Sequence, residues 1–144
     1  MIDKVQEKDY PEIVTVWEAS VRATHHFVLD EDIRFYKDLI SYKYLKQANL
    51  LCIRDDENGR IQGFLGVHED YVDMLFIHPD YFGKGVGTRL LKHALENLGA
   101  TKVSVNEQNE KALHFYKKFG FKTMRRDERD GMDMPYPILH MELS

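Results

Sequence analysis

Three glycines at alternate positions lie between a predicted strand and a predicted helix, where they can shape a phosphate-binding turn. The stretch reads Gly83-Lys84-Gly85-Val86-Gly87-Thr88. Glycine has no Cβ, so a ligand can approach the backbone closely, and the first N–H groups of a helix have no acceptor within it. Such a turn can hold a phosphate or a pyrophosphate. The alternative is a tight connection in which glycine only relieves strain.

Known phosphate-binding motifs fit this stretch unequally. A Walker loop requires Gly-x-x-x-x-Gly-Lys followed by Ser or Thr, and the sequence contains no such string. A dinucleotide fingerprint requires a third glycine where Thr88 or Leu90 stands, depending on the starting glycine. Glu107 follows about twenty residues later at the end of a predicted strand, as that fingerprint requires. Dinucleotide binding therefore stays open as a second interpretation.

Metal chemistry has little support in the sequence. Cys52 is the only cysteine, which excludes an internal disulfide and a multi-cysteine zinc site. His25 and His26 are adjacent, which is not the spacing of two metal ligands on a helix, and no His-Glu-x-x-His string occurs. We therefore expect no metal cofactor.

The elements that must position the glycine turn follow from apolar periodicity, which predicts a single α/β domain over residues 1–144. Helices are predicted from Asp9, from Asp30 to near Leu45, after the glycine turn, and over residues 110–119. The predicted strands are 2–5, 50–54, 61–67, 71–78, 102–105, 121–124 and 138–143. The glycine turn thus joins the fourth strand to the third helix.

Composition narrows the class of protein further. Of the 144 residues, 43% are hydrophobic and 31% are charged, which is enough apolar material for one globular core. The formal net charge of −4 disfavours a nucleic-acid partner, because nucleic-acid phosphates attract basic surfaces. The first residues lack the apolar stretch of a signal peptide, and the apolar runs are too short to span a bilayer. We expect a soluble, cytoplasmic protein that does not bind membranes.

In two segments the sequence resembles the GNAT-type N-acetyltransferase superfamily. The family signature, Gln/Arg-x-x-Gly-x-Gly/Ala between a strand and a helix, reads here Phe82-Gly83-Lys84-Gly85-Val86-Gly87. Phe82 departs from Gln or Arg, which removes one side-chain contact but keeps the backbone turn. The family segment Asn-x-x-Ala-x-x-x-Tyr-x-x-x-Gly-Phe matches residues 109–121, with Asn109 and Tyr116 in place. The two motifs occur in the family's order.

The resemblance extends to the layout of the whole chain. Residues 20–25, 105–110 and 135–137 are in addition similar to small bacterial members of the YjaB type. The resemblance implies a mixed, mostly antiparallel central sheet of about seven strands, flanked by about four helices. It supplies no substrate.

The resemblance also implies acetyl-CoA as the cosubstrate. The backbone of Leu75, Phe76 and Ile77 is expected to pair with the pantetheine arm like an added strand. The amides of residues 83–88, which are Gly83, Lys84, Gly85, Val86, Gly87 and Thr88, are expected to hold the pyrophosphate. Asn109 is expected to bind the pantetheine or the cofactor backbone. Alone, Asn109 is equally interpreted as the N-cap of the helix that starts at Glu110.

Acetyl transfer to an amine requires proton transfers, for which the resemblance indicates candidates. Tyr116 is expected near the sulfur, as the acid that protonates the leaving thiolate, although a tyrosine on an apolar helix face is also a core residue. Some family members use a strand glutamate as the base where Ser104 stands here, and a hydroxyl cannot do that work. The remaining candidates are Asp73, on one face with Leu75 and Ile77 if no bulge intervenes, His25, and water.

The sequence therefore predicts an acetyl-CoA-dependent N-acetyltransferase that acts on a primary amine by direct attack in a ternary complex. The acceptor is a small molecule or a peptide, and a homodimer is left open. A CoA-binding module without turnover is the first alternative, and a dinucleotide-binding enzyme is the second.

Overall fold

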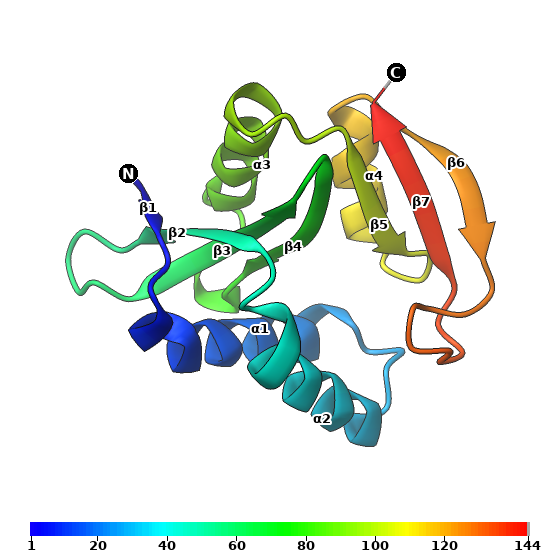
Figure 1. Cartoon of the computed structure of the whole chain (residues 1–144), viewed down its shortest axis with the longest axis horizontal. Coiled ribbons are helices and arrows are strands. Elements are labelled where there is room, and N and C mark those ends of the chain that lie inside the picture. Colours follow the sequence, from blue (N-terminus) through cyan, green and yellow to red (C-terminus); the bar gives the residue numbers. More distant parts are fainter. Residues whose placement is uncertain (144) are drawn as a thin grey trace. The chain divides into compact units, whose positions relative to one another are not determined.

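The computed structural model describes residues 1–143, with the backbone alone for residue 42, and divides them between two compact units, Met1–Ala100 and Thr101–Ser144. The single domain over residues 1–144 stays a prediction. The first unit contains β1 (Ile2–Lys4), α1 (Tyr10–Thr24), α2 (Asp30–Leu39), β2 (Asn49–Arg54), β3 (Ile61–His68), β4 (Tyr71–Ile77) and α3 (Val86–Asn97) (Figure 1). The second contains β5 (Lys102–Asn106), α4 (Glu110–Lys118), β6 (Phe121–Asp127) and β7 (Ile138–Leu143).

All strand pairs within each unit are antiparallel. The first unit has the strand order β1-β2-β3-β4, and the second has β5-β7-β6. The described residues contain seven strands and four α-helices, which confirms the predicted α/β class with mostly antiparallel strands. β6 continues to Asp127, three residues beyond its predicted end, because its exposed charged residues hide the alternation on which the prediction rests.

In the first unit, α1 and α3 lie on opposite sides of the strands (Figure 1). Side chains two residues apart in a strand share a face, which divides the apolar residues between the two helices. One face carries Leu50, Cys52 and Phe64, which belong to a cluster with the apolar side of α1. On the other face, Gly63 of β3 lies against Val86, the first residue of α3. The strands are therefore buried on both sides, as the burial of β3 shows.

The second predicted helix is helical as far as Tyr44, but in two parts. After α2, a π-helical turn covers Ile40–Tyr44. There the Leu45 N–H donates to the carbonyl of Ile40, five residues earlier, at 3.4 Å. The wider turn completes the helix near the predicted end at Leu45.

In the second unit, α4 packs against β5 and β6 and leaves one face of the strands polar. The apolar core includes Val103, Val105, Tyr116, Phe121, Leu139 and Met141. Because side chains alternate along a strand, Ser104 and His140 lie on the face opposite these residues. Ser104 is exposed there.

Three further features bear on the predicted class. Within residues 1–143, none of the helices is both long and apolar enough to cross a membrane. Over the same described residues, no group of three or more His, Cys, Asp or Glu side chains is arranged to hold a metal ion. Cys52 is free and buried in the core, and this burial raises the pKa of its thiol.

Gly63 allows β3, β4 and the start of α3 to approach one another closely. A Cβ on Gly63 would lie 2.6 Å from Ile77 Cδ1 and 3.1 Å from both the Phe76 carbonyl oxygen and Val86 Cγ1. Those neighbours are the end of β4 and the first residue of α3. A side chain at this position would therefore push apart the two elements that flank the glycine turn.

We expect Gly63→Val to lower the free energy of unfolding by about 1–3 kcal/mol, the usual cost of overpacking. Urea denaturation followed by circular dichroism measures this change. Gly131→Ala is the matched control, because a Cβ at Gly131 meets nothing within 4 Å. Equal unfolding midpoints for Gly63→Val and the wild type would show that the close approach is unimportant.

Candidate active site

The chain passes from β4 to the glycine turn through one 3-10 turn, Pro79–Tyr81, which His78 fixes at its start. The Asp80 N–H donates to Nδ1 of His78 at 3.1 Å. The His78 N–H donates to the carbonyl of Gln62 at 2.8 Å, which joins the turn to β3. His78 thus shapes the turn.

The backbone of the turn requires glycine at two positions. Gly83 has a φ of +74° and Gly85 a φ of +81°, a region that other residues rarely adopt. Gly85 is the N-cap of α3, so the amides of Val86, Gly87 and Thr88 form the first turn of that helix. Gly83, Lys84 and Gly85 are exposed, and a Cβ on either glycine would stand in open space. An anion can therefore reach these amides and the positive end of the helix dipole.

Tyr81 joins the glycine turn to the loop between β2 and β3. Its ring is buried, and its hydroxyl donates to Oδ2 of Asp55 at 3.0 Å. The backbone N–H of Glu57 and this hydroxyl both hold the pKa of the Asp55 carboxyl below its ordinary value. Lys84 Nζ lies 5.6 Å from the centre of the Tyr81 ring, a cation–π distance. The cation therefore stays beside the turn.

The sequence does not predict this role of Asp55. Asp55 and Tyr81 are 26 residues apart. The local pattern Asp55-Asp56-Glu57-Asn58-Gly59 indicates only a turn. Neither residue type nor spacing could have linked the two side chains.

The end of β4 is held by β3 and by an aromatic cluster. Leu75, Phe76 and Ile77 pair with Leu65, Phe64 and Gly63. The Phe76 ring lies 6.3 Å from Trp17 and 5.8 Å from Phe64, between ring centres. β4 is the last strand in the order of its unit. The backbone predicted to bind the pantetheine arm is therefore rigidly placed.

Asp73 lies at a bulge, so the expected alternation along β4 is interrupted there. Met74 pairs with Gly66 and Val72 with Val67, which leaves Asp73 as the extra residue. The period of two consequently does not place Asp73 on the face of Leu75 and Ile77. Its side chain is exposed, yet desolvation by neighbouring atoms raises the pKa of its carboxyl, against the opposing charge of His68.

His25, the other predicted base, follows the end of α1. The Thr24 hydroxyl donates its proton to the Ser20 carbonyl at 2.8 Å, so it must accept the hydrogen bond from His25 Nδ1 at 2.7 Å. Burial, and secondarily the charge of His26, lower the pKa of His25 to about 4. The ring is neutral at pH 7 and is a weak proton acceptor.

In the second unit, α4 carries both residues of the second motif. Asn109 is the N-cap of this helix, and its Oδ1 accepts a hydrogen bond from the Ala112 N–H at 3.3 Å. The side-chain N–H₂ of Asn109 can still donate to a ligand. Tyr116 is buried between Phe115 and Phe121, and this burial raises the pKa of its hydroxyl. Tyr116 therefore remains protonated at neutral pH.

The basic residues near the carboxyl end are paired with carboxylates of the same unit. Arg126 forms two hydrogen bonds to Glu107, at 2.6 and 3.1 Å. Arg125 is paired with Asp127 at 3.0 Å. Arginines that are paired in this way favour a solvated strand surface over a phosphate site. They also occupy Glu107, the carboxylate that dinucleotide binding would require.

The predicted residues therefore fall into two groups, one in each unit. In the first unit, the glycine turn follows the end of β4. The bulge sets the position of Asp73, and His25 is buried after the end of α1. The second unit brings Asn109 and Tyr116 together on α4. The first group combines the exposed turn at the start of α3 with the end of β4, and the second offers an amide and a phenol.

Comparison with known proteins identifies the class. The family model described as the acetyltransferase (GNAT) domain matches residues 46–123, more than half of the chain. Both motifs and the glycine turn lie in this range. The chain belongs to the GNAT family of acetyltransferases, which confirms the predicted family.

Individual relatives match over nearly the whole chain. Peptidyl-lysine N-acetyltransferase YjaB of Escherichia coli K12 is 39% identical over 140 residues, which are 97% of this chain and 94% of that protein. The solution structure of apo-form YjaB from Escherichia coli has a TM-score of 0.87 and 38% identity, and it covers 99% of this chain and 95% of its own. The chain is therefore an N-acetyltransferase by family, similar to YjaB.

A second solved structure shares the fold at lower identity. It is the PaiA N-acetyltransferase from Thermoplasma acidophilum, in complex with coenzyme A. Its TM-score is 0.75 at 22% identity, and it covers 99% of this chain and 98% of its own. This likeness shows that the two chains have the same fold.

The capping hydrogen bond of Asn109 can be tested by stability alone. We expect Asn109→Ala to cost about 1 kcal/mol of unfolding free energy, because the Ala112 N–H loses its acceptor. Asn109→Asp should keep the wild-type stability, since a carboxylate caps a helix and suits its positive end. Chemical denaturation measures both. If the alanine variant is as stable as the aspartate variant, the capping role is contradicted.

Proposed function

We propose that this protein transfers an acetyl group from acetyl-CoA to a primary amine by direct attack in a ternary complex. The observation that carries the proposal is the exposed turn with positive φ at Gly83 and Gly85, at the amino end of α3. The family supports acetyl as the transferred group. Binding both reactants together supplies acceleration by proximity, without a covalent intermediate on the protein.

The cosubstrate half of the proposal rests on the first unit and on Asn109. The amides of residues 83–88 hold the pyrophosphate, and Lys84 adds a positive charge beside them. The backbone of Leu75, Phe76 and Ile77 pairs with the pantetheine arm and offers an N–H to the oxyanion. The side-chain N–H₂ of Asn109 donates to the cofactor while its Oδ1 caps α4. The open space above Gly83 and Gly85 supports this assignment.

Tyr116 is proposed as the acid that gives its proton to the departing thiolate. Its raised pKa keeps the phenol protonated at every pH at which the enzyme would work. The phenol proton passes to the thiolate that forms as the carbon–sulfur bond breaks. Burial between Phe115 and Phe121 fixes the ring and limits access of competing water.

For the proton of the amine, the first unit offers the two groups predicted from the sequence. His25 is the weaker acceptor, because its pKa is about 4. Asp73 is the more accessible one, because its side chain is exposed, and desolvation raises the pKa of its carboxyl. Asp73 is therefore the acceptor that we favour in this unit.

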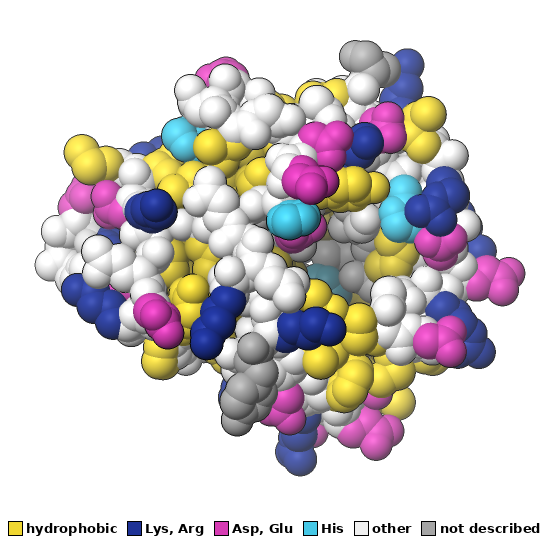
Figure 2. Space-filling model, in the orientation of Figure 1, with side chains coloured by type: hydrophobic (Ala, Val, Ile, Leu, Met, Phe, Trp, Pro, Cys, Tyr) yellow, Lys and Arg dark blue, Asp and Glu magenta, His cyan; other side chains and the backbone are white. Residues whose placement is uncertain are grey.

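The acceptor class that we propose first is the amine of a lysine side chain in a peptide. The relative named for peptidyl-lysine acetylation is similar over nearly the whole chain, which supports this choice. The net charge of −4 suits a cationic acceptor. Acidic and basic side chains are interspersed on the face in Figure 2, which suits a peptide better than a polyphosphate. We infer a cytoplasmic setting.

The alternative of a CoA-binding module without turnover has one specific observation in its favour. Ser104 stands where a carboxylate base is expected in some members, and a hydroxyl alone cannot accept the amine's proton. This alternative predicts CoA binding without amine-dependent thiol release. The two experiments below separate it from the transferase.

The glycine turn is tested by binding. Acetyl-CoA and CoA should raise the melting temperature of the wild type, and NAD(P) should not. Gly85→Ala should weaken CoA binding by about tenfold or more, ~1.4 kcal/mol, because a Cβ enters the space over the turn and strains its backbone. Calorimetry measures the affinity.

Gly99→Ala is the matched control for the strain. Gly99 also has a positive φ, +70°, and open space around it, but it follows the carboxyl end of α3. Its substitution should lower stability by a similar amount and leave CoA affinity unchanged. Equal CoA affinities for the two variants would contradict the phosphate site.

Tyr116 is tested by turnover. Thiol release from acetyl-CoA should depend on an added amine, with lysine peptides, polyamines and free amino acids as the panel. Tyr116→Phe should lower kcat about 10²-fold, the scale of a general acid, with CoA affinity unchanged. An unchanged rate would remove Tyr116 from the mechanism, and the absence of amine-dependent release by the wild type would favour the binding module.

A further inference from the structure

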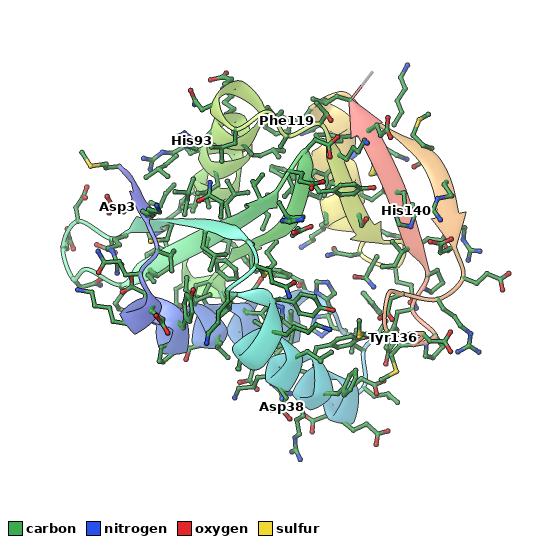
Figure 3. All side chains as sticks on the ribbon, viewed as in Figure 1. Asp3, Asp38, His93, Phe119, Tyr136 and His140 are labelled. Carbon is green, nitrogen blue, oxygen red and sulfur yellow. The ribbon has the colours of Figure 1, made fainter. Side chains whose placement is uncertain are left out.

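Three polar side chains, those of Ser104, His140 and Asp127, meet on the face of the second unit that α4 leaves uncovered. Ser104 of β5 pairs with His140 of β7, and His140 pairs with Arg125 of β6. Asp127 lies two residues beyond Arg125 on the same side of β6. Figure 3 labels His140, which projects from β7. The group therefore draws on all three strands of this unit.

The three side chains form a continuous hydrogen-bonded chain. Ser104 Oγ lies 3.2 Å from Nδ1 of His140, and Nε2 of His140 lies 2.7 Å from Oδ2 of Asp127. Arg125 donates to both oxygens of Asp127, each at 3.0 Å. Hydrogen bonds from His140 and the charge of Arg125 lower the pKa of the Asp127 carboxyl, which keeps it ionised at neutral pH.

These contacts fix where the protons lie. An ionised carboxylate only accepts hydrogen bonds, so Nε2 of His140 must carry a proton and donate it to Asp127. In the neutral ring, Nδ1 then has the lone pair and accepts from the Ser104 hydroxyl. His140 is thus held in the tautomer in which its free basic nitrogen faces Ser104. Holding one tautomer and stabilising its imidazolium is what a carboxylate does for a histidine base.

Ser104 and Asp127, at the two ends of the hydrogen-bonded chain, are more exposed than His140, which lies between them. The His140 side chain is 21% exposed, that of Asp127 is 42% exposed, and Ser104 is exposed. A molecule on this face therefore meets the Ser104 hydroxyl without first displacing the histidine. The exposed hydroxyl is the entrance of the chain, and the carboxylate is its charged end.

The other charged groups around His140 come from the same three strands. Arg125 lies opposite it on β6, and Glu142 is the next residue on its face of β7. In the strand register, Glu142 lies opposite Lys102 of β5 on one side and opposite Lys122 of β6 on the other. Glu107 and Arg126 are paired with each other. From α4, on the opposite face, the buried residue is Tyr116.

We propose that Ser104, His140 and Asp127 form a proton relay that takes up the proton of the acceptor amine, an inference that rests on the proposed acetyl transfer. Ser104 Oγ accepts a proton from the ammonium group while the hydroxyl proton passes to Nδ1 of His140. The ammonium becomes a neutral amine, Ser104 remains a hydroxyl, and the imidazole becomes an imidazolium beside Asp127. The amine's lone pair then attacks the acetyl carbonyl, and the imidazolium later returns its proton to water. Asp127 is a positioning residue in this step.

The relay predicts a particular pH profile. The relay requires a neutral His140 ring, because Nδ1 cannot accept from the Ser104 hydroxyl once it carries a proton. In the wild type, kcat/KM should therefore rise with pH and then level off. Without the relay, kcat/KM should keep rising toward the pKa of the amine, because only the fraction that is already neutral reacts.

The experiment compares His140→Ala, Ser104→Ala, Ser104→Thr and Asp127→Asn with Glu142→Gln, the control on the same face. At pH 7 we expect His140→Ala to lower kcat/KM for a lysine peptide about 10²-fold, with CoA affinity unchanged. Added imidazole should restore part of the rate, and Ser104→Thr should retain the hydroxyl and most of the activity. With an acceptor of low pKa, such as a hydrazide, His140→Ala should lose little of its kcat/KM, since that acceptor is already neutral at pH 7. Glu142→Gln should match the wild type.

Several outcomes would overturn the relay. One is a His140→Ala enzyme that matches the control, and another is a loss that leaves the pH profile unchanged and does not respond to imidazole. Acetylation of Ser104 in the wild type, seen by intact mass, would make Ser104 a nucleophile instead. If Asp73→Asn loses activity while His140→Ala keeps the full rate, the group that accepts the amine's proton lies on β4.

A measurement without turnover separates the relay from the proposed function. Long-range proton–nitrogen NMR should show neutral His140 protonated at Nε2, and Asp127→Asn should weaken this preference. Protonation at Nδ1 would break the chain whatever the enzyme does. If the wild type releases no thiol with any amine but shows the Nε2 tautomer, the proposed function fails while the hydrogen-bonded chain stands.

Discussion

The start of α3 depends on two backbone torsions that a side chain would oppose. Gly83 and Gly85 take positive φ values, and this brings the chain from β4 into a helix whose first amides are exposed. The surrounding contacts keep that turn in place. Tyr81 binds Asp55, His78 binds Gln62, and Gly63 gives room for both flanking elements. An anion site made of backbone amides is useful only if the backbone cannot relax, and these contacts supply that rigidity.

Much of the fold could be predicted from the sequence, because its signals are local. Apolar alternation located the strands, helical periodicity located the helices, and the spacing of Gly83 and Gly85 located the turn. The cap of α4 by Asn109 followed in the same way from residue type and position. The parts that could not be predicted depend on contacts between distant residues. The bond from Tyr81 to Asp55 is one example, and the pairing of Ser104 with His140 is another.

The candidate proton-transfer groups show the same division. His25 was chosen for its ordinary pKa near 6.5, but burial, which no local pattern reveals, lowers that pKa to about 4. Asp73 was assigned to a face by the period of two, and the bulge at that residue breaks the period. Ser104 was set aside because a hydroxyl alone is not a base. Its partner on β7 comes 36 residues later and becomes a neighbour only through strand pairing.

The register shift in β6 marks a position at which this strand can lose one residue. Thr123 pairs with Met141 and Arg125 with His140, so Met124 is the one residue of this stretch without a counterpart on β7. Its side chain is 65% exposed. Loss of this residue would leave Lys122 opposite Glu142 and Asp127 opposite Ile138, with every flanking pair retained. The strand therefore contains a position where one residue can be removed while the carboxylate, imidazole and hydroxyl groups keep their order across the three strands.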